Sequence, residues 1–173
     1  MLEKKQLLDF VEKYGDEVMY FALSLVKNRP DAEDACQEML VQMIRHSENF
    51  DGNRDIKNWA FTILYRKCLD QLKKRRRFLN FFERAAEACP ARKEDGPENS
   101  IQMRLPESVL NRLKPKEKAC LLLWAKEGYN TEELAHIVGC APGTVRVHLF
   151  QARKKLKKLM ERGNEKKVLV SSG

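Results

Sequence analysis

The stretch NTEELAHIVGCAPGTVRVHLFQARKKLKKL, residues 130–159, decides the fold of this chain. Asn130 can cap a first helix, and Glu133 three residues later completes a capping-box pattern. Gly139 then ends that helix, and Pro142 suits the first position of the next one. The stretch therefore predicts two helices joined by a short turn.

The second of these helices is predicted to have two different sides. At about 100° per residue, its apolar residues fall on one stripe, formed by Val145, Leu149, Ala152, Leu156 and Leu159. The opposite side carries Arg146, Val147, Phe150, Gln151, Lys154, Lys157 and Lys158. Such a helix is typical of helix-turn-helix recognition, in which N-terminal residues reach base edges and C-terminal lysines lie near phosphates. Charge alone would favour a different reading, a solvated basic helix on an ordinary bundle.

The positive charge of the chain is concentrated in two short segments. The net charge is +8. Residues 66–77 and residues 142–162 each carry seven Lys or Arg and one acidic residue, or +6 apiece, so the remainder sums to −4. Two compact basic segments on a mildly acidic background predict two separate contacts with a polyanion.

Sequence features that would indicate export are missing. The N-terminal MLEKKQLLDF lacks the uninterrupted apolar core of a signal peptide, and no apolar run approaches the ~20 residues of a membrane span. The five cysteines are odd in number and widely spaced: Cys36, Cys68, Cys89, Cys120 and Cys140. This usage is typical of reduced thiols and predicts a cytoplasmic protein without a disulfide framework.

Helical periodicity dominates the chain, and we expect an all-α fold of two small helical domains joined by a flexible linker. Asn28-Arg29-Pro30 should break the first helix, and Asp31 should cap the second. The N-terminal helices are expected at residues 5–27, 31–47 and 56–77, with a loop at 50–56. The C-terminal ones are expected at 107–113, at 115–125 and in the helix-turn-helix. The expected boundaries are 1–80 for the first domain, 81–104 for the linker, 105–162 for the second domain and 163–173 for a frayed tail.

The helix expected at 56–77 also has two faces. Its predicted core face consists of Phe61, Leu64, Cys68 and Leu72. Its predicted exposed stripe consists of Trp59, Thr62, Arg66, Asp70, Lys73 and Arg77. An aromatic ring among cations suits stacking on unpaired bases while the cations follow the backbone, so this stripe favours a strand being separated. The alternative is that Trp59 is half-buried packing and that the cations are merely solvated.

Signs of enzymatic chemistry are lacking in the sequence. There is no Gly-rich phosphate loop and no recognisable nucleophile-and-base arrangement, so we expect no catalysis and no cofactor. His136 and Cys140 are four residues apart, but no further ligand follows at zinc-like spacing. We therefore expect no metal site.

Three segments resemble those of bacterial sigma factors of the extracytoplasmic-function (ECF) group, within the sigma-70 family. DAEDACQE (31–38) is similar to the group's DAEDLVQE segment. FDGNRDIKNWAFTILYRKCLDQLKKRRR (50–77) is similar to its F-x-G…W-L-x-x-I-A-x-N…D-x-L-R-R-R segment. LKPKEKACLLLWAKEGYNTEELAHIVGCAPGTVRVHLFQARKKL (113–156) is similar to its L-P…G-x-S-x-E-E-I-A…G-T-V-x-S-R-L-x-R-A-R segment. The three segments occur in the right order and cover nearly the whole chain.

The resemblance implies a sigma-2 and a sigma-4 domain that bind core RNA polymerase and promoter DNA, and it implies an anti-sigma factor as a further partner. The residues implied to contact the clamp helices of the polymerase are Asp31, Asp34, Gln37 and Glu38. Those implied to capture and open the minus-ten element are Phe50, Asp51, Asn53, Arg54, Trp59, Arg66, Lys67, Lys73 and Lys74. Those implied to read the minus-thirty-five element are Pro142, Gly143, Thr144, Arg146, Val147, Phe150, Gln151 and Lys154.

Some positions depart from the pattern of the group. Lys67 stands where Asn is usual, and Ile44 replaces a common Trp. In the recognition helix, Val147 and His148 replace a Ser-Arg pair and Gln151 replaces Arg. The loss of two cations should reduce phosphate affinity or change which bases are read, and His148 falls beside the apolar stripe, where it could pack instead of contacting DNA.

A stand-alone transcriptional regulator is the alternative function. Its N-terminal half would dimerise or sense a signal, and its C-terminal half would bind an operator. The helix at 56–77 discriminates between the two functions, because a dimerisation domain does not need an exposed stripe of Trp59, Arg66 and Lys73.

Overall fold

The computed structural model describes residues 2–50, 55–85 and 110–170, with the side chains of 80–85, 126, 127, 160 and 162–170 outside that description. The described residues are helical, without a strand among them, which confirms the predicted all-α fold. The chain divides into two compact units, Met1–Ser100 and Ile101–Gly173.

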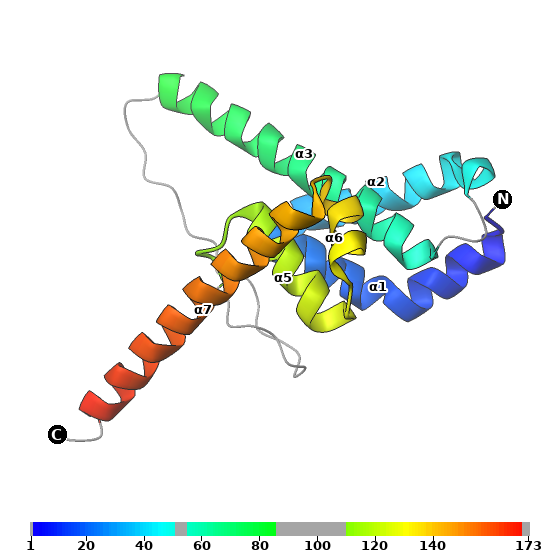
Figure 1. Ribbon diagram of the computed structural model, residues 1–173. Coiled ribbons are helices and arrows are strands. Elements are labelled where there is room, and N and C mark those ends of the chain that lie inside the picture. Colours follow the sequence, from blue (N-terminus) through cyan, green and yellow to red (C-terminus); the bar gives the residue numbers. More distant parts are fainter. Residues whose placement is uncertain (1, 51–54, 86–109, 171–173) are drawn as a thin grey trace. The chain divides into compact units, whose positions relative to one another are not determined.

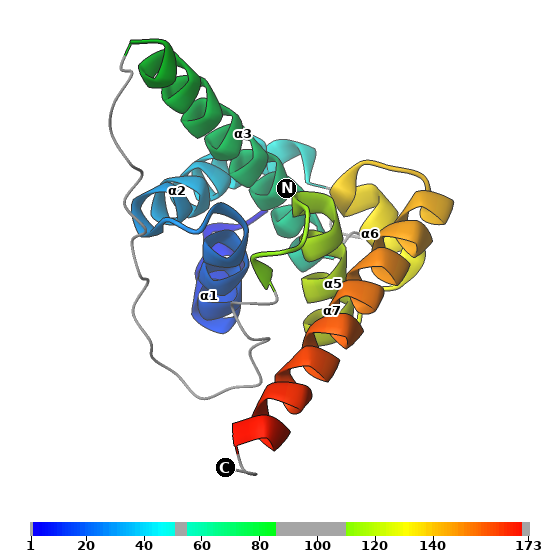
Figure 2. The same ribbon diagram turned by 90° about the vertical axis from the view of Figure 1, so that its left-hand side faces the viewer.

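The first unit is built from three helices that pack against one another, α1 (Lys4–Val26), α2 (Arg29–Arg45) and α3 (Ile56–Ala85) (Figure 1). A short 3-10 helix, η1 (Ser47–Asn49), follows α2. The amide of Leu2 donates to the carbonyl of Ser47 at 2.8 Å, which ties the residues just before α1 to the start of η1. Figures 1 and 2 show α3 continuing well beyond the ends of its two partners.

The start of α2 differs from the prediction. Asn28 caps this helix, and its side-chain oxygen accepts from the amide of Asp31 at 3.0 Å. The first helix ends at Val26, close to the predicted break, and Pro30 lies inside the first turn of α2. The prediction that Asp31 is the cap was wrong, because an N–H is not needed for intrahelical bonding in the first turn and proline is tolerated there.

The core of the first unit confirms most of the face predicted for α3. Phe61, Leu64 and Cys68 are buried, and the Phe61 ring meets Phe21 of α1 edge-on, with 5.3 Å between centroids. Thr62, however, is only 4% exposed, so its place on the exposed stripe was predicted wrongly. Its hydroxyl donates to the carbonyl of Asn58 at 2.8 Å, and a polar group satisfied in this way can be buried at little cost.

The second unit contains α5 (Pro115–Glu127), α6 (Thr131–Val138) and α7 (Pro142–Val170). The Asn130 side chain accepts from the amides of Glu132 and Glu133, and the Glu133 carboxylate accepts from the Asn130 amide at 2.8 Å. Gly139 ends α6 with a φ of 67°, in the left-handed region. The predicted helix-turn-helix and its capping signals are thus confirmed.

Two helices are longer than predicted. α3 continues to Ala85 rather than ending near residue 77, and α7 continues to Val170, so the tail expected to fray from Gly163 is helical through Val170. Neither extension contains a proline, the residue that interrupts helices most strongly. Residues 86–104 of the predicted linker lie outside the described residues, as do residues 107–109 of the helix expected at 107–113. In the described remainder of that helix, Leu110 is helical and residues 111–113 form a turn and a bend, so the expected end at residue 113 was wrong.

The turn at Gly139 should be sensitive to any side chain. A Cβ there would meet no atom within 4 Å, but an L residue is strained at its φ of +67°. We expect Gly139→Ala to lower the unfolding free energy of this unit by about 1 kcal/mol, whereas Gly143→Ala, on an ordinary helical backbone with equally open space, should not lower it. Native-state hydrogen exchange at the α6 and α7 amides measures both; equal effects of the two variants would contradict this reading.

Candidate nucleic-acid interface

The helix α7 has the two sides that its sequence predicted. Val145 and Ala152 are fully buried and Leu149 nearly so, while Leu156 and Leu159 are partly exposed. All eight residues implied to read the minus-thirty-five element are solvent-exposed, namely Pro142, Gly143, Thr144, Arg146, Val147, Phe150, Gln151 and Lys154. The outer side of α7 is therefore a continuous, accessible surface in its first four turns.

An ion pair that sequence reasoning missed holds α7 against α5. Lys155 donates to the Glu117 carboxylate at 2.6 Å, across 38 residues of sequence. The same carboxylate accepts from the Lys114 amide at 3.0 Å and so caps α5. A Glu three residues after Lys114 could have indicated the cap, but no local pattern indicates the contact with Lys155.

The Glu117 carboxylate is stabilised in its charged form. Its side chain is 7% exposed, and burial alone would raise its pKa. The hydrogen bonds from Lys155 and from the Lys114 amide, together with the positive charges of both residues, outweigh burial and lower the pKa below its ordinary value. The contact between α5 and α7 therefore depends on an ionised carboxyl.

Two further side chains of α7, Arg153 and His148, lie in different surroundings. The Arg153 guanidinium lies over the Trp124 ring of α5 at 4.0 Å from the centroid, a cation–π contact. His148 is half-buried, and its Nε2 is enclosed without a hydrogen-bond partner within the described part of the chain. His148 therefore packs beside the apolar stripe instead of extending the exposed face.

On α3, the charged residues of the predicted stripe are exposed as expected, whereas the tryptophan at its start is only half-exposed. Arg66, Asp70, Lys73 and Arg77 are exposed. Trp59 is half-buried, and its ring lies against the buried Phe50, with 4.9 Å between centroids and a tilt of 33°. Asp51, Asn53 and Arg54 lie outside the described residues. The Phe50–Trp59 pair therefore forms the boundary between the core and the basic stripe.

The start of α3, where Trp59 lies, is held by α1. The Lys57 ammonium contacts the Glu17 carboxylate at 3.0 Å and lies over the Tyr14 ring at 4.5 Å from the centroid. Because Lys57 lies in the first turn of α3, these contacts hold that turn against α1.

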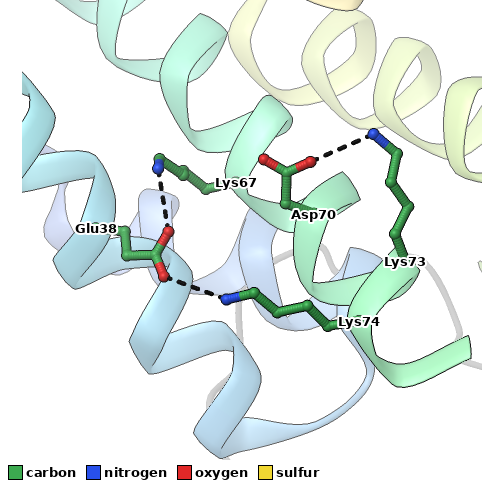
Figure 3. A network of polar contacts seen from close by, with 5 residues as sticks. All are labelled: Glu38, Lys67, Asp70, Lys73 and Lys74. Atoms are coloured by element: carbon green, nitrogen blue, oxygen red, sulfur yellow. Dashed lines mark hydrogen bonds and ion pairs between the residues drawn. The ribbon is translucent and has the colours of Figure 1, made fainter. Parts of the chain in front are cut away.

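A single carboxylate on α2 is shared by two lysines of α3 (Figure 3). Glu38 lies 3.1 Å from the Lys67 ammonium and 3.7 Å from that of Lys74, and a separate pair joins Lys73 to Asp70 at 3.3 Å. On the same helix as Glu38, Asp34 and Gln37 are exposed and Asp31 is partly exposed. The structure thus joins one residue implied to bind polymerase to two residues implied to bind DNA.

Three of the thiols, those of Cys36, Cys68 and Cys120, are buried and are not poised for chemistry. Burial raises the pKa of Cys120 to about 12 and, together with the charge of Glu33, that of Cys36 to about 11; burial also raises the pKa of Cys68. Within the described residues, no cluster of three or more His, Cys, Asp or Glu side chains could hold a metal ion. None of the described helices has the length and hydropathy needed to cross a membrane.

Comparison with known protein families assigns both units. The model described as "Sigma-70 region 2" matches residues 10–78, and the model described as "Sigma-70, region 4" matches residues 107–156. The first match contains the three-helix packing of α1 to α3 up to the basic stripe, and the second contains the helix-turn-helix. The chain therefore belongs to the sigma-70 family.

The relatives specify the group within this family. The chain is 29% identical over 140 residues to the ECF RNA polymerase sigma factor EcfG of Rhodopseudomonas palustris, covering 81% of this chain and 77% of the relative. It is 28% identical over 158 residues to the RNA polymerase sigma factor SigV of Bacillus subtilis, covering 88% and 93%. A solved structure of the sigma factor RpoE in complex with the anti-sigma factor NepR, from Bartonella quintana, has a TM-score of 0.70, 26% identity and coverage of 88% and 97%. The group is that of the ECF sigma factors.

The Glu117–Lys155 contact predicts a dependence of stability on pH. A carboxyl whose pKa is lowered by folding stabilises the folded state above its unfolded pKa of about 4.3, and this contribution is lost as the pH falls through the lowered pKa. We expect Glu117→Gln to cost about 1–3 kcal/mol at pH 7 and less at pH 3. Urea unfolding at both pH values measures this.

The matched control is Glu161→Gln, which removes an exposed partner 4.0 Å from Lys157 on the same helix α7. This variant should change the unfolding free energy by less than about 0.5 kcal/mol at either pH. An equal loss in both variants would show that the buried contact contributes nothing of its own.

Proposed function

We propose that this sigma factor reads the minus-thirty-five element with α7 and opens the minus-ten element with α3, while α2 binds core RNA polymerase. The observation that carries the proposal is the outer side of α7. Residues 142–159 contain six cations and no carboxylate. The exposed residues begin in the first turn of α7, and the start of a recognition helix is the part that enters the major groove. Lys154, Lys157 and Lys158 would contact phosphates.

For the minus-ten element, the support comes from the order of side chains along α3. Trp59 lies at the start of the helix, and Arg66, Lys73 and Arg77 follow it on exposed turns. Trp59 offers a stacking platform for an unpaired base, and the cations follow the separated strand. Phe50, packed under the indole, would keep that platform in place.

For the polymerase, the support is the acidic, exposed side of α2. Asp34 and Gln37 are accessible, and Glu38 is partly so. The solved relative RpoE is bound to the anti-sigma factor NepR. We extend this to the present chain and expect a protein of the same kind to hold it inactive by covering one of these faces.

As a transcription initiation factor, the chain would act on DNA only within polymerase, in the cytoplasm, and would catalyse no reaction itself. The family matches favour this function over a stand-alone regulator, since they cover the first unit as well as the helix-turn-helix. Run-off transcription with purified core polymerase on DNA of the host tests the function. Start sites that require the protein support it; no such sites, together with tight operator binding by the free protein, would reject it.

We expect Trp59→Ala to impair strand opening more than closed-complex formation. Base stacking on an aromatic side chain contributes about 1–3 kcal/mol, so the open fraction should fall about tenfold. Permanganate reactivity of the opened thymines measures opening, and filter binding measures the closed complex. Trp124→Ala, which removes the other tryptophan, should leave the open fraction of bound promoters unchanged.

The shared carboxylate of Glu38 should weaken DNA binding by the free protein, because it neutralises Lys67 and Lys74. We expect Glu38→Gln to raise the affinity for a single-stranded oligonucleotide about threefold to tenfold at low salt. The salt dependence should steepen by about 0.7 for each lysine that gains a phosphate.

The control is Glu33→Gln, which removes the same charge from α2 but frees only Arg29, 2.8 Å away on that helix. It should raise the affinity much less. The gain from Glu38→Gln should also vanish when Lys67 and Lys74 are both Gln; a gain that persists there would mean that net charge, and not this contact, is responsible.

A further inference from the structure

Two large apolar side chains are exposed to solvent on the outer side of α7. Val147 is 56% exposed and Phe150 is 62% exposed. The stripe of this helix that packs into the core, with Val145 and Ala152 fully buried, lies on the other side of the helix. Single exposed apolar side chains are common on protein surfaces, but two neighbouring ones on the face that the proposed function places against DNA offer a surface for contact with that partner.

The two side chains form a single small surface. They are three residues apart on a helix, which places their Cβ atoms about 5–6 Å from each other. Arg146, Gln151 and Lys154 are exposed around them. The pair is therefore an apolar spot inside a rim of cations and an amide.

The chemistry of this rim selects the partner. No acidic residue occurs between 142 and 159, so the rim fits a polyanion. Between the phosphate ridges of the DNA major groove, the apolar group that the bases present is the 5-methyl of thymine. Val and Phe side chains cannot form hydrogen bonds, so at these two positions a base can be distinguished only by its shape and its methyl group.

We propose that Val147 and Phe150 are specificity-determining residues that contact thymine 5-methyl groups in the minus-thirty-five element. The inference rests on the proposed function, in which α7 enters the major groove. Because the two side chains are about 5–6 Å apart and base pairs are spaced by about 3.4 Å, the two thymines lie one or two base pairs apart, on either strand. Arg146 and Gln151 beside them would supply the hydrogen bonds.

Replacement of thymine by uracil tests the proposal, since it removes the methyl group and leaves every hydrogen-bonding group in place. The promoter is first defined by run-off transcription with the full-length protein and core polymerase. Each minus-thirty-five thymine is then replaced by uracil, one at a time, and the affinity of the holoenzyme for the closed complex is measured. We expect a loss of about threefold to fivefold at two positions, the effect of one buried methyl group.

Three variants assign the effect to the side chains. With Val147→Ala, the affinity should be the same for thymine and uracil at one of the two positions. With Phe150→Ala, it should be the same at the other position. Both residues are exposed, so neither variant should change the unfolding free energy by more than about 0.5 kcal/mol. Lys154→Ala should weaken binding to thymine and uracil promoters equally, because it removes a phosphate contact.

The outcomes separate the inference from the function on which it rests. The proposal is supported if uracil lowers the affinity at two positions and if each alanine variant removes this loss at one of them. Initiation at full strength on every uracil promoter, or a penalty that both alanine variants retain, overturns the proposal and leaves the proposed function standing. A protein that directs no start sites at all overturns the proposed function and, with it, the inference.

Discussion

In each unit, one helix supplies both the core and the basic surface, and this double use is the constraint on which the rest of the structure depends. α7 buries Val145 and Ala152 and exposes the cations on its other side. α3 buries Phe61 and Leu64 and exposes Arg66 in the same manner. Since successive residues of a helix differ by about 100° in direction, burial of one stripe fixes where the other stripe points.

Burial of a stripe sets the rotation of a helix but not its position along its own axis. Polar contacts between helices fix that position. Lys155 on α7 is joined to Glu117 on α5, and Lys67 on α3 is joined to Glu38 on α2. The carboxylate of the first pair is 7% exposed, whereas that of the second pair is 41% exposed. The pair with the exposed carboxylate is therefore the one that DNA or a protein partner can compete with at lower cost, because solvent-exposed ion pairs contribute little to stability.

Local signals in the sequence predicted the fold, but contacts between residues far apart in the sequence were not predicted. Asn130 and Gly139 act on their own neighbours, so their roles in the helix-turn-helix could be read directly. Asp31 was misread as the cap of α2 because Pro30 is tolerated within the first turn, and Thr62 was placed outside because its hydroxyl finds its acceptor on its own helix. The Glu117–Lys155 contact spans 38 residues, a distance at which no periodic pattern operates. The roles of the site residues on α2, α3 and α7 remain predictions, supported by their exposure.

The division of α7 into a buried and an exposed stripe has a consequence for evolution. Substitutions at exposed positions such as Val147 and Gln151 cost little folding free energy, while those at Val145 or Ala152 would open cavities or overfill the core. After a gene duplication, the promoter preference of one copy could therefore diverge by changes in a few outward side chains, with no compensating change elsewhere. New regulons can arise in this way on a scaffold that stays constant.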